Sequence, residues 1–154
     1  MVENNLETFF EAFLSRESVF FNKKALQSAY LPETILHREN QTKQIANTLA
    51  PVLKEEKPSN LFVYGKTGTG KTLTIRHTTQ KIREITEREN IPLRIIYINC
   101  KIKRSTDTEY RLIAQLAREL GKSIPPTGLP TEEVYRIFFK VLNKQKQNHI
   151  IILD

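Results

Sequence analysis

The sequence predicts an α/β fold in which a parallel β-sheet is flanked by helices. Apolar runs at residues 61–64, 93–99 and 150–153 alternate with segments whose apolar residues recur at helical spacing. Strands that alternate with helices indicate βαβ units, in which successive strands run parallel. Because the runs show no polar alternation, the sheet is expected to be covered by helices on both faces.

The first 36 residues are predicted to form an N-terminal helix and a connector, and residues 37–154 the main domain. Apolar side chains recur at helical spacing up to about Leu14, which favours an amphipathic helix. They are Leu6, Phe9, Phe10 and Phe13. The segment that follows is expected to be a connector.

The main domain is predicted to begin with a helix from about Arg38 to Leu53, kinked near Pro51. The next apolar run, residues 61–64, is short enough to be either a strand or part of a helix. The glycine that follows and the β-branched and aromatic content favour a buried strand. A helix to about Asn90 and a second strand at 93–99 are expected next.

The last third of the chain repeats this alternation. A helical stripe runs from Tyr110 to Leu120, and Gly121 is the expected stop. A loop at 124–130, rich in proline, precedes a second helical stripe from Val134 to Leu142. The third strand is expected to end at the last residue, Asp154.

A phosphate-binding loop lies between the first strand and its helix. The pattern G-x-x-x-x-G-K-[ST] is complete, and the chemistry depends on each residue type. Glycines let successive backbone N–H groups point inward, the following helix adds partial positive charge, and the lysine reaches the β- and γ-phosphates. The expected ATP-binding residues are Gly65, Lys66, Thr67, Gly68, Thr69, Gly70, Lys71 and Thr72. A glycine-rich turn that matches by chance is the alternative.

The predicted third strand ends on Asp154, which is the candidate magnesium ligand together with the Thr72 hydroxyl. In P-loop NTPases an aspartate at the tip of a buried strand holds Mg²⁺ directly or through water. The alternative is a loop aspartate that only caps the strand. In many ATPases of this kind a glutamate follows directly and polarises the attacking water. That position lies beyond Asp154, so no catalytic general base is named.

Composition limits the remaining functions. The formal net charge of +7 favours polyanionic partners such as nucleic acid, although a lysine-rich surface alone would also produce it. No apolar run approaches the ~20 residues of a membrane span. Cys100 is the only cysteine, which excludes an intrachain disulfide and fits a cytoplasmic protein.

Several segments together resemble the archaeal replication-initiator group of AAA+ ATPases, relatives of the eukaryotic origin-recognition and cell-division-cycle loading factors. The resemblance runs in order from about residue 17 to the end, and its more specific parts lie outside the phosphate-binding loop. The matching segments are Leu36-His37-Arg38-Glu39-Asn40, Pro58-Ser59-Asn60 leading into Leu61–Gly65, Tyr97-Ile98-Asn99-Cys100, Thr127-Gly128-Leu129-Pro130 and Ile150–Asp154.

The resemblance implies a three-layer P-loop NTPase fold and an initiator that binds ATP and origin DNA and helps load the replicative helicase. Other initiator subunits are further expected partners. By the same resemblance, His37 and Arg38 lie near the adenine base, whereas the alternative places both in the first turn of a solvated helix. The loop 124–130 is the candidate DNA contact, and Lys101, Lys103 and Arg104 could assist it. The alternative is that these basic residues only form a solvated surface.

Several parts of the family pattern lie outside this chain, so the domain is expected to be incomplete at its C-terminus. In the implied sheet order a later strand separates the first strand from the third. The first strand would then be unpaired on at least one side, so this stretch alone is expected to be poorly stable and a weak or inactive ATPase. The resemblance implies that the full protein is a slow ATPase. A signalling or defence P-loop ATPase and a transposition or recombination ATPase remain as alternatives.

Overall fold

The computed structural model describes residues 3–16, 20–27, 30–100, 108–125 and 128–154. It divides the chain into two compact units, Met1–Pro32 and Glu33–Asp154.

The first unit contains the predicted N-terminal helix, α1, which spans Glu3–Ser15. Its apolar face is exposed, as Phe9 and Phe13 illustrate with 61% and 64% of their surface open. The short helix η1, Lys23–Leu26, follows. Its first turn is capped by Asn22, whose side-chain oxygen accepts a hydrogen bond from the Lys24 N–H at 3.0 Å.

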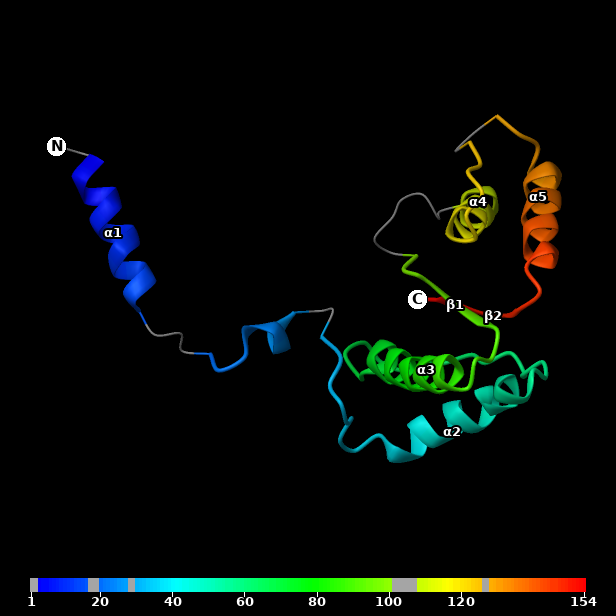
Figure 1. Ribbon diagram of the computed structural model, residues 1–154, viewed down its shortest axis with the longest axis horizontal. Helices are drawn as coiled ribbons and strands as arrows, with labels where there is room; N and C mark the ends of the chain where they lie inside the picture. Colours follow the sequence, from blue (N-terminus) through cyan, green and yellow to red (C-terminus); the bar gives the residue numbers. More distant parts are fainter. Residues whose placement is uncertain (1–2, 17–19, 28–29, 101–107, 126–127) are drawn as a thin grey trace. The chain divides into compact units, whose positions relative to one another are not determined.

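The second unit has three layers, with a small parallel sheet between two pairs of helices (Figure 1). This arrangement confirms the predicted α/β class. In chain order the elements are α2 (Glu39–Leu49), η2 (Ala50–Lys54), α3 (Lys71–Arg88), β1 (Leu93–Ile98), α4 (Glu109–Glu119), α5 (Thr131–Lys144) and β2 (Asn148–Leu153). At the predicted kink, α2 is followed by the 3-10 helix η2, which has Pro51 in its first turn.

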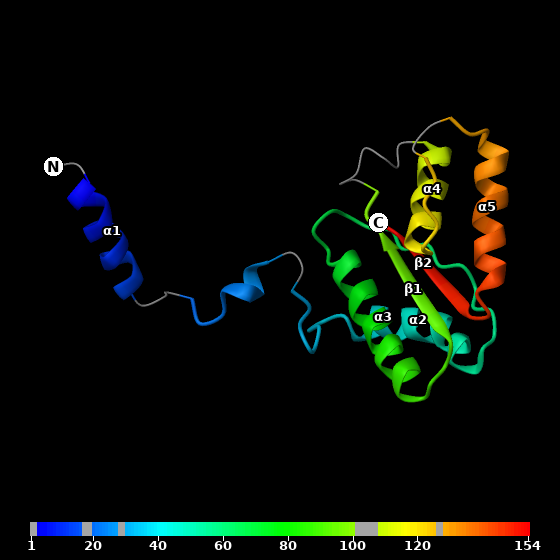
Figure 2. The same ribbon diagram turned by 45° about the horizontal axis from the view of Figure 1, so that its top comes forward.

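The sheet pairs β1 with β2 in parallel, so both strands end at the same edge (Figure 2). In this register Ile95 lies opposite Ile150 and Ile98 opposite Leu153. The parallel pairing brings the end of the chain beside the residues that follow β1. This edge is therefore where polar side chains from distant parts of the sequence meet.

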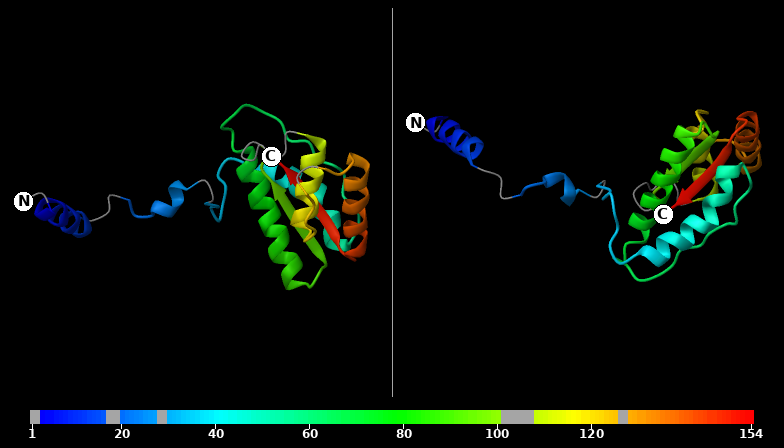
Figure 3. Two further views of the ribbon diagram at one scale, coloured as in Figure 1. Left: turned by 90° about the horizontal axis from the view of Figure 1, so that it is seen from above. Right: turned by 60° about the horizontal axis from the view of Figure 1, so that its bottom comes forward.

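Successive strand residues point to opposite faces, and each face packs against its own helices. Ile96 and Ile98 face α4 and α5 in one hydrophobic cluster, which includes Val134 and Phe138. Ile150 faces α2 and α3 in a second cluster, around Ile45, Leu49, Val52 and Ile82. Figure 3 shows the same order of layers from two further directions. The predicted covering of both faces is confirmed.

The prediction of a strand at residues 61–64 is wrong for this structure. These residues have no regular secondary structure, because no described strand lies beside them to complete a ladder. Phe62 and Tyr64 are 85% and 83% exposed, and their rings stack on each other at 6.1 Å.

A hollow of about 320 Å³ separates this segment from the sheet. Residues 57–63 form one wall and β2 forms the other, with Ile75 and Thr79 of α3 also lining it. Among the described residues β1 is the only strand paired with β2, so the second edge of β2 faces this hollow. In the sheet order that the resemblance to AAA+ proteins implies, a further strand would lie between residues 61–64 and β2, which is the position of this hollow.

Candidate nucleotide-binding site

The phosphate-binding loop has the backbone shape that its glycines permit. Gly68 and Gly70 have φ angles of 78° and 79°, in the left-handed region that other residues avoid. A Cβ atom built on either glycine would meet nothing within 4 Å. The conformation of the backbone, rather than a lack of space, is therefore what requires glycine at both positions.

Helix α3 begins at Lys71, so the last two residues of the loop 65–72 form its first turn, and Gly70 is its N-cap. Because glycine has no side chain, no side-chain oxygen caps the first turn. The free N–H groups and the positive end of the helix dipole are thus available to an anion. Thr74 lies just behind, and its hydroxyl donates to the Gly70 carbonyl at 2.9 Å, which ties the loop to the helix.

The Lys71 ammonium lies over the loop itself. Its Nζ donates hydrogen bonds to the carbonyl oxygens of Gly65 at 3.0 Å and Lys66 at 2.9 Å. The Thr69 hydroxyl also donates to the Lys66 carbonyl, at 2.8 Å. The Lys71 ammonium is thus held beside the loop at the start of α3, which is a suitable arrangement for a group with several negative oxygens.

The structure brings Thr72 and Asp154 together, although they are 82 residues apart in sequence. The Thr72 hydroxyl lies 3.0 Å and 3.1 Å from the two carboxylate oxygens of Asp154. The Asp154 backbone is fixed at the sheet edge by two bonds: its N–H donates to Ile98, and its carbonyl accepts from Cys100. A hydroxyl and a carboxylate at one point provide the oxygen ligands that Mg²⁺ prefers.

Tyr97 is a member of this site that sequence reasoning missed. Its hydroxyl donates to the Asp154 carboxylate at 2.5 Å, and the guanidinium of Arg76 lies 5.8 Å from the centre of its ring. Burial, and then the hydrogen bond to Asp154, raises the pKa of Tyr97 to about 12. The signal that could have found it is the shared edge of parallel strands, where a polar residue near the end of one strand meets the end of the next.

Replacing Tyr97 with phenylalanine is expected to lower the free energy of unfolding by about 1 kcal/mol, because a hydrogen bond to a carboxylate is lost at a partly exposed position. The folded-state pKa lies above the ordinary value of 10.0. The stabilisation is therefore fully present below pH ~10 and is lost as the pH rises towards about 12. Urea unfolding of both proteins between pH 7 and pH 11 measures this difference. Equal stabilities at pH 7 would contradict it.

His37 and Arg38 lie immediately before α2 rather than within it. His37 has a φ of 60°, which is unusual for a residue other than glycine, and its N–H donates to the Glu39 carboxylate at 3.2 Å. Arg38 is the N-cap residue of α2. Arg38 thus stands at the start of the first helical turn, since its carbonyl accepts from the Thr42 N–H, and the place of both residues beside an adenine stays a prediction.

The candidate DNA contacts fall largely outside the described residues. Lys101, Lys103 and Arg104 belong to that undescribed part, as do two residues of the loop 124–130.

Within the described part of the chain, no group of three or more histidine, cysteine, aspartate or glutamate side chains could hold a metal ion. No helix in those same ranges is both long and apolar enough to cross a membrane.

A model of the AAA ATPase domain matches residues 34–139, which is most of the chain. The chain belongs to this family. The match includes the loop, α3 and β1, so these elements are those of an AAA ATPase domain. The predicted class of P-loop fold is confirmed.

The chain is also similar to proteins named ORC1-type DNA replication proteins. It is 41% identical over its whole length to the one from Thermococcus onnurineus and 42% identical over 97% of its length to the one from Pyrococcus abyssi. It spans only 37% and 36% of those relatives.

Among solved structures, the Aeropyrum pernix ORC1 protein in complex with DNA matches 90% of this AAA ATPase chain. The match has a TM-score of 0.80 at 36% identity and covers 36% of that structure. The Aeropyrum pernix ORC2 protein, solved as ADPNP–ADP complexes, has the same fold, with a TM-score of 0.69 at 20% identity. The resemblance to archaeal replication initiators is thus confirmed.

Proposed function

We propose that the protein is an ATP-binding DNA replication initiator. The observation that carries the nucleotide-binding part is the convergence of Lys71, Thr72 and Asp154 at the N-terminus of α3. The similarity to ORC1-type DNA replication proteins along the whole chain supports the initiator part. It also favours this reading over a signalling or transposition ATPase.

The triphosphate of ATP would lie in the loop 65–72, where backbone N–H groups, the helix dipole and Lys71 all favour negative charge. Lys71 would exchange its bonds to the Gly65 and Lys66 carbonyls for bonds to phosphate oxygens. These carbonyls hold the ammonium ready beside the loop, so little reorganisation is needed when the nucleotide binds. His37 and Arg38 are the proposed neighbours of the adenine.

Thr72 and Asp154 are the proposed Mg²⁺ ligands, and their oxygen donors fit this ion. Bound there, Mg²⁺ would supply neutralisation of the negative charge on the phosphates. Tyr97 would hold the Asp154 carboxylate in a fixed orientation. Hydrolysis of ATP to ADP and phosphate is proposed for the full protein only.

The DNA-binding and helicase-loading parts of the proposal rest on similarity and charge. One neighbour in structure was solved in complex with DNA, and the net charge of +7 favours a polyanion. Origin duplex DNA, the replicative helicase and other initiator subunits are the proposed partners. Residues 37–154 are proposed to be the N-terminal part of the ATPase domain.

The test is DNA binding by the full protein, with an origin duplex compared with a random duplex of equal length across a salt series. We expect the origin duplex to bind at least about 100-fold more tightly and both affinities to fall with salt. Addition of ATP is expected to change the affinity for the origin. Equal affinities for both duplexes at every salt concentration, with and without ATP, would exclude an origin-binding initiator.

A further inference from the structure

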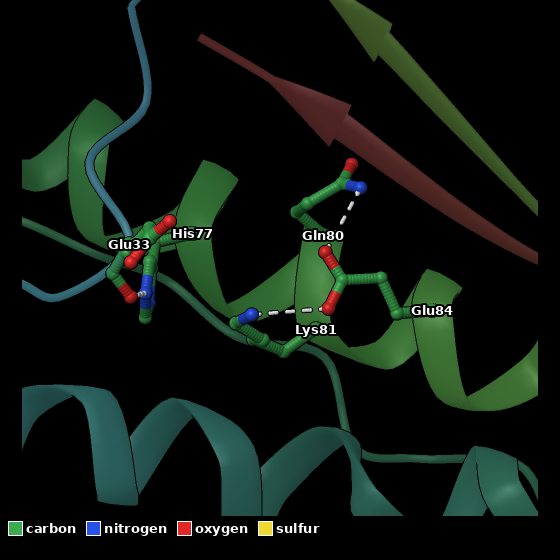
Figure 4. Close-up of polar contacts among 5 residues, drawn as sticks. All are labelled: Glu33, His77, Gln80, Lys81 and Glu84. Atoms are coloured by element: carbon green, nitrogen blue, oxygen red, sulfur yellow. Dashed lines mark hydrogen bonds and ion pairs between the residues drawn. The ribbon is translucent and has the colours of Figure 1, made fainter.

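His77 of α3 joins the start of the second unit to the helix that carries the phosphate-binding loop. Its Nε2 lies 2.9 Å from the backbone carbonyl oxygen of Glu33, 44 residues earlier in the chain (Figure 4). A carbonyl oxygen only accepts hydrogen bonds, so the imidazole must carry its hydrogen on Nε2. His77 therefore acts as the donor in this contact.

The other ring nitrogen of His77, Nδ1, shows that hydrophobic packing alone does not explain a histidine at this position. Nδ1 is buried and is the one buried side-chain nitrogen or oxygen of the described residues without a hydrogen-bond partner. Burying an acceptor without a donor is unfavourable, and an apolar ring would avoid this cost. A polar ring at this position is thus explained by its bond to Glu33 rather than by its own burial.

The segment that begins at Glu33 is held at both ends. At its far end the His37 N–H donates to the Glu39 carboxylate, and the Arg38 carbonyl accepts from Thr42 in the first turn of α2 at 2.9 Å. The strained φ of 60° at His37 lies between these anchors. Strained backbone of this kind persists where the surrounding structure fixes it, and it is concentrated at binding sites.

We propose that His77 is a positioning residue that fixes the segment Glu33–Arg38 against α3, so that its residues can receive the base of the bound nucleotide. This inference rests on the proposed function, in which His37 and Arg38 are the neighbours of the adenine. His77 lies six positions after Lys71, which is about 9 Å along the helix at ~1.5 Å per residue. The helix α3 would thus fix both the site of the phosphates and the position of residues 33–38, which would receive the adenine.

The experiment compares two ligands of the full protein, Mg·ATP and Mg·tripolyphosphate, which lacks the base and the ribose. His77→Phe removes the donor while keeping a flat ring, and His77→Gln returns an N–H group near the position of Nε2. Lys81→Gln is the matched control, since Lys81 lies on the same helix and pairs with Glu84 at 3.0 Å on the surface (Figure 4).

We expect His77→Phe to weaken ATP binding about 10-fold and to leave tripolyphosphate binding within about twofold of the unaltered protein. His77→Gln should restore most of the ATP affinity, and Lys81→Gln should change neither affinity. Equal weakening of both ligands by His77→Phe, or unchanged binding of both, would overturn the proposal. If the unaltered protein binds neither ligand, the proposed function itself fails, which is a different result.

Amide hydrogen exchange in the unaltered protein provides a second test that does not depend on how a variant folds. The amides of residues 34–38 should gain protection with Mg·ATP and not with Mg·tripolyphosphate. Loss of this extra protection in His77→Phe, with recovery in His77→Gln, would support the positioning role. Identical exchange of these amides with both ligands in the unaltered protein would overturn it.

Discussion

Replacing Lys71 with alanine is expected to weaken Mg·ATP binding by the full protein at least about 100-fold and to abolish hydrolysis. The ammonium would make charge-assisted hydrogen bonds to phosphate oxygens, and about 3 kcal/mol corresponds to a loss of this size. In the structure its bonds go to two exposed loop carbonyls, which water can satisfy in the variant. The melting temperature should therefore change little, and isothermal titration of the folded variant measures the loss.

Arg88→Ala is the matched control for Lys71→Ala. Arg88 also carries one positive charge on α3, but it pairs with Glu89 on the surface at the other end of the helix. This variant should bind Mg·ATP as the unaltered protein does. If Lys71→Ala and Arg88→Ala show the same ATP affinity and the same hydrolysis as the unaltered protein, the phosphate-binding role of the loop is excluded.

Replacing Asp154 with asparagine is expected to remove the dependence of nucleotide binding on magnesium. The substitution keeps the size of the side chain and its contact with Thr72, but it removes the negative charge that would neutralise the ion. In the unaltered protein, ATP should bind more weakly with EDTA than with Mg²⁺, whereas in Asp154→Asn the two affinities should coincide. Hydrolysis by the full protein should fall at least about 100-fold, since the metal stabilises charge in the transition state.

Thr72 supplies the matched pair for this experiment. Thr72→Ala removes the hydroxyl that lies beside Asp154, and Thr72→Ser keeps it. The alanine variant should lose most of the magnesium dependence, while the serine variant should keep it. An unchanged difference between Mg²⁺ and EDTA in both Asp154→Asn and Thr72→Ala would show that the ion is held elsewhere.

The parts of the fold that could be predicted from sequence are those fixed by local patterns. The helical stripe after the loop became α3, and the apolar runs at 93–99 and 150–153 became β1 and β2. The run at 61–64 has the composition of a strand, but a strand also needs a neighbour to share hydrogen bonds. Composition cannot show whether that neighbour is present, so the prediction failed there.

Only those residues of the candidate site that belong to a recognisable sequence pattern could be predicted. The loop 65–72 could be read from its spacing, and the link to Asp154 followed from the expected end of a buried strand. The contacts of Tyr97 with Asp154 and of His77 with Glu33 span 57 and 44 residues. Contacts of this kind depend on strand register and on the course of a connecting segment, and neither leaves a local pattern in the sequence.

We expect the loop and the first turn of α3 to receive the triphosphate. The most direct test is to follow the backbone amide NMR signals of the full protein during titration with Mg·ATP. We predict the largest shifts at Gly68, Gly70, Lys71 and Thr72, with the same signals moved by Mg·tripolyphosphate. Saturable ATP binding that leaves these four signals in place, while signals elsewhere move, would contradict triphosphate binding in this loop.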